Sequence, residues 1–181
     1  MVTVSSDLVF DGLLGRAYVE RDEPAPVCAY GRSKAEAEER LLAMDADTLI
    51  IRTSAFFGPW DKHNFLFNTV EALKRGEDVV ASDKTVVSPT YVPDLVQATL
   101  DLLLDEEKGL WHLTNQGAIS WHELACEVAD LAKVGSGQIR VDDQAIAADT
   151  SLSSSRGLLL RPLDGALSEF VGSSEMLKRL L

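Results

Sequence analysis

The sequence predicts an α/β fold in which helices cover a mainly parallel sheet. Short apolar segments typical of strands alternate along the chain with segments of helical periodicity, the order from which parallel βαβ units are built. The clearest strand, TLIIRT at residues 48–53, is apolar or β-branched at nearly every position, as in a strand covered on both faces. With 181 residues, 46% of them hydrophobic, the chain is long enough to bury one core.

The first third of the chain contains two predicted strands and the helix between them. Residues 1–6 form a short apolar strand that leads into a turn, and a polar loop follows as far as Pro26. Residues 29–43 are predicted to be a helix whose apolar contacts come from alanine and leucine, and whose charged residues, Glu38 among them, face water. The FFGP segment then stops the strand at 48–53.

The rest of the chain is predicted to alternate short strands with amphipathic helices. Gly76 is placed to end one helix, and Ser120, with Glu123 three residues later, to begin another with a capping box. The segment 142–161 is predicted to be mostly loop. The expected helices are 64–75, 93–104, 121–133, 163–171 and 174–181, and the expected strands lie around Val79, around Val86, at 109–113 and at 138–141.

The net charge of −12, from 17 basic and 29 acidic residues, argues against binding to nucleic acid. Phosphate backbones are bound by clustered lysine and arginine. Binding of a small anionic ligand is still possible if a local pocket of basic side chains opposes the negative electrostatic field of the whole chain. The candidate cations for such a pocket are Arg52, Lys62, Arg156 and Arg161.

The sequence favours a cytoplasmic protein without a metal centre. No apolar run approaches the roughly 18 residues that span a bilayer, and the first residues lack the features of a signal peptide. Cys28 and Cys126 are far apart and show no CxxC spacing, so we expect reduced thiols and neither a disulfide nor a metal site. The histidines also lack the spacing of metal ligands.

The stretch YGRSK places a tyrosine and a lysine four positions apart at the start of the predicted helix. Residues at this spacing lie on one helix face, so Tyr30 and Lys34 can point into one crevice. A cation beside a phenol favours its ionised form, which makes the phenol a usable proton donor. Ser6 ends the first strand, at the sheet edge where ligands bind, and its hydroxyl can stabilise the alkoxide formed from a carbonyl.

Several motifs together resemble a known family. They are SSDLVFDG at 5–12, YGRSKAEAE, RTSAFFG, SPTYVPDL at 88–95, GLWHLTNQGAISWHELA and the late TSLSS. In these motifs the sequence resembles the extended, sugar-nucleotide branch of the short-chain dehydrogenase/reductase superfamily, and within it the dTDP-4-dehydrorhamnose reductases. The resemblance covers nearly the whole chain. It implies a doubly wound, Rossmann-like parallel sheet with a small substrate-binding α/β lobe.

The resemblance also implies a reaction, the reduction of a 4-keto nucleotide-sugar with NAD or NADP as cofactor. Tyr30 would donate the proton, Lys34 would bind the nicotinamide ribose and tune Tyr30, and Ser6 would take the place of the family's threonine. Asp7 and Asn64 would contact the sugar. The residues implied at the cofactor are Tyr30, Lys34, Thr53 and Ser54.

Two departures from the family pattern leave other functions open. Leu8 stands where a tyrosine is common, and Ala55 follows RTS where a bulky aromatic is often found. Both changes remove groups that contact a sugar, and they suit a non-catalytic binding module of the same fold, like the regulatory subunit of methionine adenosyltransferase. An epimerase or a dehydratase of the superfamily is a third interpretation. Dehydratases of this branch usually carry more than one acidic residue beside the hydroxyl position. Here Asp7 is the one acidic residue at that place, so reduction is preferred.

The sequence contains no glycine-rich cofactor turn. Such a turn holds the pyrophosphate of a dinucleotide at a helix N-terminus, whereas the GLLG at 12–15 is followed by a proline-bearing loop. By resemblance, the chain is expected to start at about the fifth strand of the family fold, as one partial domain. Residues 1–60 would form the second half of the sheet with the catalytic helix, and 61–181 the remaining strands and the substrate lobe.

If the chain is only the second part of the family fold, it needs a partner segment to complete it. The amino-terminal, cofactor-binding half would be supplied by the same parent chain or by a partner, and this chain alone would bind NAD or NADP poorly and be inactive. The open edge of the first strand would pair with another segment, for example a second copy in a homodimer.

Overall fold

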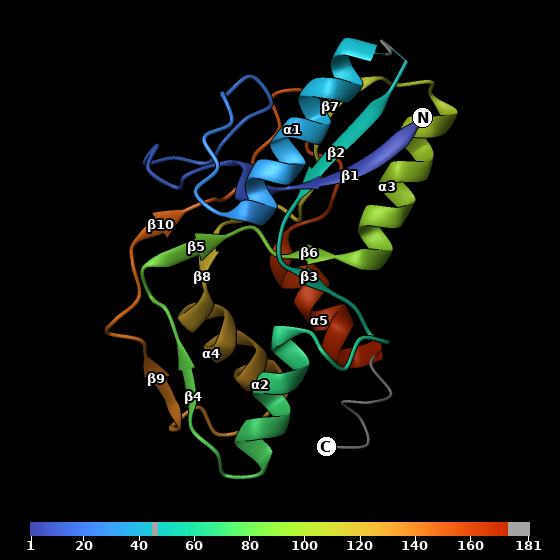
Figure 1. Ribbon diagram of the computed structural model, residues 1–181. Coiled ribbons are helices and arrows are strands. Elements are labelled where there is room, and N and C mark those ends of the chain that lie inside the picture. Colours follow the sequence, from blue (N-terminus) through green and yellow to red (C-terminus); the bar gives the residue numbers. More distant parts are fainter. Residues whose placement is uncertain (45–46, 174–181) are drawn as a thin grey trace.

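The computed structural model describes residues 1–44 and 47–173, and it contains the expected parallel sheet (Figure 1). Strand β1 (Val2–Ser6) pairs in parallel with β2 (Leu49–Thr53), which pairs in parallel with β7 (Gly109–His112). The order β1-β2-β7 places β2 in the middle, and every residue of β2 is buried. The apolar and β-branched residues at 48–53 therefore predicted the buried environment of β2 correctly.

The edge at which β1 and β2 end is the part of the sheet that positions the site. The register pairs Ser6 with Thr53, so the two strands finish side by side. Because the carboxyl ends of parallel strands meet at one edge, the side chains that follow β1 and β2 are brought together there. A 3-10 helix, η1 (Asp7–Val9), begins directly after β1, and the Ser6 hydroxyl accepts a hydrogen bond from the Leu8 N–H at 3.2 Å.

Two long helices cover opposite faces of this sheet (Figure 1). Helix α1 (Ala29–Met44) lies over the face that carries Arg52, to which it is bonded. Helix α3 (Val92–Leu104) lies over the other face, where its apolar side chains form one buried cluster with Leu49 and Ile51 of β2. Both helices were predicted from the sequence, and both begin within a residue of the predicted start.

Glu38 of α1 is buried, contrary to the prediction that it faces water. Its carboxylate receives hydrogen bonds from the Arg52 guanidinium at 2.6, 2.9 and 3.1 Å, and the two side chains are 4% and 3% exposed. Because α1 contains several glutamates, its own sequence does not indicate which glutamate faces the sheet. The indication comes from β2, where Arg52 interrupts a buried apolar strand and needs a counter-charge.

The remaining helices and short strands form a lobe below the sheet in Figure 1. Three helices, α2 (Phe65–Lys74), α4 (Trp121–Leu131) and α5 (Leu163–Ser173), pack around a second apolar core that includes Val128 and Phe170. The short strands pair as β3 (Phe56–Phe57) with β6 (Thr90–Tyr91), β4 (Val79–Ala81) with β9 (Ile139–Val141), and β5 (Thr85–Val87) with both β8 (Ile119–Ser120) and β10 (Ala148–Asp149).

The predicted helices of the lobe agree closely with the structure, but four of its short strands, β3, β6, β8 and β10, were not predicted. The capping box of Ser120 and Glu123 is present, but α4 ends at Leu131 and not at 133. The two phenylalanines predicted only to stop β2 form the strand β3, and β10 lies within the segment predicted as loop. The predicted helix over 174–181 lies outside the described residues. Among the described helices, none combines the length and apolar character needed to cross a bilayer.

Gly31, within the YGRSK stretch, allows α1 to pack directly on η1. A Cβ at this position would lie 1.9 Å from the Leu8 carbonyl oxygen and 3.1 Å from the Pro26 Cβ. We therefore expect Gly31→Ala to lower the free energy of unfolding by about 1–3 kcal/mol, because the backbone has to move. Urea unfolding followed by circular dichroism measures the change.

Gly172 in α5 is the matched control for this substitution. Among the described residues, no atom outside its own stretch of helix lies within 4 Å of the place where its Cβ would stand. The same change to alanine is expected there to raise stability by up to about 1 kcal/mol, through helix propensity alone. A Gly31→Ala variant as stable as Gly172→Ala would show that the contact between α1 and η1 is not tight.

Candidate active site

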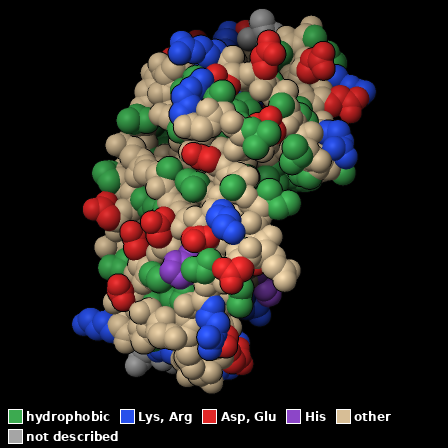
Figure 2. All heavy atoms as spheres, turned by 90° about the vertical axis from the view of Figure 1, so that its left-hand side faces the viewer, with side chains coloured by type: hydrophobic (Ala, Val, Ile, Leu, Met, Phe, Trp, Pro, Cys, Tyr) green, Lys and Arg blue, Asp and Glu red, His purple; other side chains and the backbone are tan. Residues whose placement is uncertain are grey.

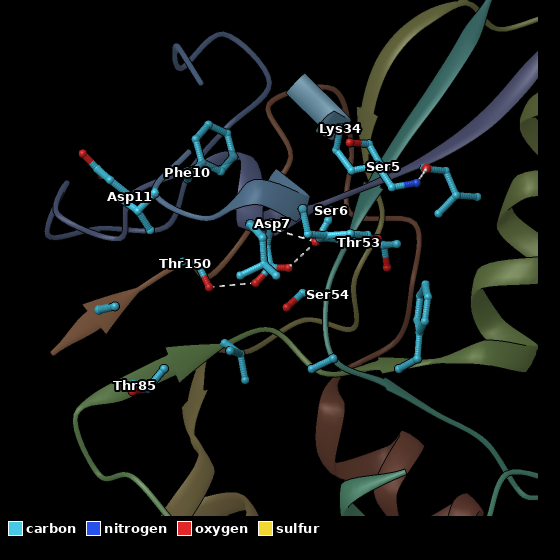
Figure 3. Close-up of a pocket in the computed structure, with 18 of the residues that line it drawn as sticks. Ser5, Ser6, Asp7, Phe10, Asp11, Lys34, Thr53, Ser54, Thr85 and Thr150 are labelled. Atoms are coloured by element: carbon cyan, nitrogen blue, oxygen red, sulfur yellow. Dashed lines mark hydrogen bonds between the residues drawn. The ribbon is translucent and has the colours of Figure 1, made fainter. Parts of the chain in front are cut away.

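The candidate site is a pocket of about 580 Å³ at the edge where β1 and β2 end (Figure 3). It is lined by the end of β1 with η1, by the start of α1, by the segment after β2, and by β5 and β10 of the lobe. Its wall combines apolar side chains such as Phe56, Val87 and Trp121 with several hydroxyls. A concave, largely apolar pocket with a few convergent polar groups is the usual form of a small-molecule site.

The tyrosine and the lysine of YGRSK both line this pocket, as their spacing predicts. The Lys34 ammonium lies 5.6 Å from the centroid of the Tyr30 ring and donates a hydrogen bond to the Val4 carbonyl oxygen at 3.0 Å. The Tyr30 side chain is 53% exposed and is therefore open to a ligand. The backbone of β1 thus anchors the lysine, and the lysine places a positive charge beside the phenol ring.

Ser6 and Asp7 form a hydrogen-bonded pair in the same pocket (Figure 3). Ser6 Oγ donates to Asp7 Oδ1 at 3.0 Å, and Thr150 Oγ1, directly after β10, donates to Asp7 Oδ2 at 2.7 Å. Asp7 is 6% exposed, and no ion pair to it is found in the described part of the chain. The pocket therefore holds a buried carboxyl group whose partners are neutral hydroxyls.

Burial raises the pKa of Asp7 above that of an ordinary aspartate. The hydrogen bonds from Thr150 and Ser6 act in the opposite direction without outweighing burial, and the nearby Ser54 hydroxyl, which makes no well-formed hydrogen bond, also favours the carboxylate. Because the folded pKa exceeds the unfolded one, Asp7 supports folding below its unfolded pKa. That contribution is lost as the pH rises through the folded pKa.

Thr53 and Ser54, predicted at the nicotinamide end, also line the pocket. Thr53 Oγ1 donates to Thr90 Oγ1 at 3.2 Å. Within the described residues, the Ser54 hydroxyl and the hydroxyl of Ser5 on the neighbouring strand are buried without a well-formed hydrogen bond, although Ser54 lies close enough to Asp7 to favour its carboxylate. Buried hydroxyls are normally hydrogen-bonded, so these two groups on the pocket wall have bonding capacity left for a polar ligand.

Asn64, predicted to contact the sugar, does not line this pocket. It caps α2: its Oδ1 accepts from the Phe67 N–H at 2.9 Å, and its Nδ2 donates to the carbonyl oxygens of Gly58 and Asp61. An asparagine just before an amphipathic helix is a typical N-cap, and this role accounts for its polar side-chain atoms. A sugar contact from Asn64 stays a prediction.

Three of the four cations suggested for an anion pocket are used elsewhere. Arg52, Arg156 and Arg161 each bind an acidic side chain at 2.6–2.7 Å, and none of them lines the pocket. Within the described residues, Lys34 is the one basic residue on its wall. On the face in Figure 2, lysine and arginine side chains are spread among acidic ones.

A second polar network, which the sequence did not reveal, fastens the TSLSS segment to the sheet. Glu20 accepts hydrogen bonds from Ser154 Oγ at 2.5 Å, from Ser155 Oγ at 2.8 Å and from the His112 N–H at 3.1 Å. Partial burial raises the pKa of Glu20, but the hydrogen bonds from Ser154 and Ser155 outweigh it and lower the pKa to about 2. Glu20 therefore stabilises the fold above its unfolded pKa and stops doing so as the pH falls toward 2. Thr150, at the start of the TSLSS segment, is held separately, because its N–H donates to the Val86 carbonyl oxygen at 3.1 Å.

The pocket fits the nicotinamide and ribose of a dinucleotide better than it fits the pyrophosphate. The unpartnered Ser54 hydroxyl stands with Tyr30, Lys34 and Thr53 on the wall, where donors and acceptors suit an amide and a ribose. The sequence has no GxGxxG turn for a pyrophosphate. In the described ranges, 1–44 and 47–173, no group of three or more histidine, cysteine or acidic side chains is arranged to hold a metal ion.

Comparison with known proteins gives consistent relatives. The model of the RmlD substrate binding domain matches residues 1–156. A dTDP-4-dehydrorhamnose reductase of Aggregatibacter actinomycetemcomitans is 36% identical over 137 residues, covering 71% of this chain and 46% of that protein. A dTDP-4-keto-6-deoxy-D-glucose reductase of Streptomyces niveus is 32% identical over 143 residues, covering 77% of this chain and 49% of that protein. The chain thus spans about half the length of the curated relatives it matches.

The solved structures show the same likeness. A dTDP-4-dehydrorhamnose reductase of Bacillus anthracis, in complex with NADP, superposes with a TM-score of 0.87 at 26% identity, covering 95% of this chain and 65% of that one. The predicted fold class, part of a Rossmann-like α/β fold with a parallel sheet, is confirmed. The resemblance to dTDP-4-dehydrorhamnose reductases, found first in short motifs, is confirmed as well.

Proposed function

We propose, from the premise that this chain belongs to the RmlD substrate binding domain family, that its pocket binds a keto nucleotide-sugar whose carbonyl the whole protein reduces. The proposed substrate is a 4-keto-6-deoxy sugar joined to dTDP, the kind of compound for which the Streptomyces niveus relative is named. NADPH is the proposed reductant, because the Bacillus anthracis relative was solved with NADP.

The observation that carries this proposal is the convergence of Ser6, Tyr30 and Lys34 on one pocket. A hydroxyl and a phenol supply the hydrogen-bond donors that stabilise an oxygen as it gains negative charge. An ammonium beside the phenol supports proton transfer from it. The apolar side chains of Phe56 and Val87 on the same wall offer a surface against which a deoxy sugar ring packs.

In the proposed reaction, each of these residues has a separate task. Ser6 and Tyr30 donate hydrogen bonds to the carbonyl oxygen, and Tyr30 delivers the proton that turns the alkoxide into a hydroxyl. Lys34 stabilises the phenolate left on Tyr30, and its hydrogen bond to the Val4 carbonyl oxygen keeps it in place. Asp7 borders the sugar and acts through its bond to Ser6.

The cofactor is proposed to lie beside the same residues. Tyr30, Lys34, Thr53 and Ser54 would hold the nicotinamide and its ribose, and the nicotinamide would supply the hydride. The unpartnered hydroxyl of Ser54 and the lysine ammonium are the groups that support this placement. The hydroxyl and the ammonium are hydrogen-bond donors, and they match the acceptor oxygens of the nicotinamide amide and of the ribose hydroxyls.

The test is an assay of the whole protein with NADPH and dTDP-4-keto-6-deoxy-D-glucose. We expect reduced nicotinamide to be consumed in an amount equal to that of a dTDP-sugar alcohol, which mass spectrometry detects as the substrate plus two hydrogens. dTDP-glucose, which has no carbonyl at this position, is the control and should consume none. Binding of the keto-sugar without reduction would contradict the proposal and favour a non-catalytic binding module of the same fold.

A further inference from the structure

The single hydroxyl proton of Ser6 is committed to Asp7. Ser6 Oγ donates to Asp7 Oδ1 at 3.0 Å and accepts from the Leu8 N–H at 3.2 Å. A serine hydroxyl offers one donor and two acceptor positions, so only an acceptor position is left for a ligand. A substrate carbonyl oxygen is itself an acceptor and needs a donor. The observed arrangement therefore suits a ligand hydroxyl better than a ligand carbonyl.

Thr150 completes this arrangement from a distant part of the chain (Figure 3). Its hydroxyl donates to the second carboxylate oxygen of Asp7 at 2.7 Å, so both oxygens of Asp7 face hydroxyl donors. The other ionisable residues on the pocket wall are Asp11, Tyr30 and Lys34, and in the described structure none of them is hydrogen-bonded to Asp7. A buried carboxylate without a cationic partner is weakly stabilised in its charged form.

We propose that Asp7 is a positioning residue that sets the direction of the Ser6 hydroxyl according to its own ionisation, and that Thr150 holds the Asp7 carboxyl group for this purpose. The inference rests on the proposed role of Ser6 as donor to a carbonyl. When Asp7 is ionised, the Ser6 proton points to it, and the pocket offers an acceptor. When Asp7 is neutral, its proton is donated to a neighbouring hydroxyl, and the Ser6 proton is free to turn into the pocket.

The two ionisation states therefore select different ligands. A ketone binds with uptake of one proton by Asp7, whereas the alcohol made from it donates its own hydroxyl proton to Ser6 and needs no uptake. By linkage, bound ketone must raise the pKa of Asp7. Burial already raises this pKa in the free chain, which brings the neutral form nearer to the working pH. No bond between heavy atoms forms or breaks in this step.

A carbon-13 NMR titration of the carboxyl groups, with Asp7→Asn to assign the signal, measures the ionisation of Asp7 in this chain. Thr150→Val keeps the shape of the side chain and removes the donor, so we expect the titration midpoint of Asp7 to shift upward. Ser6→Ala, which removes the other donor, should shift it in the same direction. Thr85→Val is the matched control: Thr85 lines the same pocket but donates to the Ile146 carbonyl oxygen, and the midpoint should not move.

An unchanged midpoint in both Thr150→Val and Ser6→Ala would overturn the inference. A second measurement, kcat/KM for the ketone against pH in the whole protein, tests the direction of the Ser6 hydroxyl. We expect kcat/KM to fall as the pH rises through the Asp7 midpoint, and Thr150→Val to move that fall upward by the shift seen in the NMR titration. A pH profile that Thr150→Val leaves in place would contradict the role of Asp7.

Failure of the proposed function can be distinguished from failure of the role proposed for Asp7. If the whole protein reduces no ketone, that function is wrong, and the inference is decided by repeating the NMR titration with the keto-sugar present. A midpoint of Asp7 raised by the keto-sugar, and not by the corresponding sugar alcohol, supports the inference. Equal midpoints with the two ligands overturn it.

Discussion

Replacing Glu38 with glutamine is expected to lower the free energy of unfolding by about 3–5 kcal/mol, because it leaves Arg52 as an uncompensated cation inside the protein. Three hydrogen bonds of 2.6–3.1 Å join the two side chains. Arg52 also lies 4.9 Å above the Phe10 ring and meets the His112 ring at 3.4 Å, so its charge is enclosed. Urea denaturation of the chain measures the loss.

Glu36 provides the matched control on the same helix. It forms an ion pair with Arg40 in which both side chains are more than half exposed, at 60% and 72%. Glu36→Gln should therefore cost no more than about 0.5 kcal/mol. The double change Glu38→Leu with Arg52→Met should lose less than Glu38→Gln, because no charge stays buried. Equal losses at Glu36 and Glu38 would contradict the buried pairing.

Most of the fold could be predicted because its signals are local. The strand at 48–53 is marked by its own apolar side chains, and α4 by the Ser120 and Glu123 capping box that precedes it. Glu38 was misplaced because its environment depends on Arg52, which comes from another element. Hydrophobic periodicity records which faces are apolar, but it does not record which polar residues are paired inside.

The same distinction explains what could be predicted of the site. Tyr30 and Lys34 share a helix face by spacing, and Ser6 ends a parallel strand, so short-range geometry brings them to one edge. Thr150 could not be predicted, because 143 residues separate it from Asp7 and only the folded lobe brings the two together. Its backbone is held by another distant element, because the Thr150 N–H donates to the Val86 carbonyl oxygen of β5 at 3.1 Å.

A large effect on catalysis is expected at Tyr30. Phenylalanine keeps the ring beside Lys34 and removes the hydroxyl, for which the described structure shows no partner. We expect kcat for the keto-sugar to fall by roughly 10²–10⁴-fold, the usual contribution of a general acid. The free energy of unfolding should change little, because the side chain is half exposed and its hydroxyl bonds nothing in the described part of the chain.

Tyr18 is the control for this substitution. Its ring stacks on Phe10 with centroids 4.0 Å apart, and its hydroxyl donates to Asp11 at 2.7 Å, but the residue does not line the pocket. The same hydroxyl accepts from the N–H groups of Leu13 and Leu14. Tyr18→Phe should therefore lower stability by about 1–3 kcal/mol through the lost hydrogen bonds and leave turnover unchanged. The two tyrosines thus separate a catalytic effect from a structural one.

The most direct test of the proposed site is the turnover of dTDP-4-keto-6-deoxy-D-glucose by the whole protein with NADPH, compared between the native protein and Tyr30→Phe. If the pocket formed by Ser6, Tyr30 and Lys34 is the catalytic site, the native protein reduces the sugar, and Tyr30→Phe binds it but reduces it at least about 10²-fold more slowly. Undiminished reduction by Tyr30→Phe would contradict this, because the proton would then come from another group.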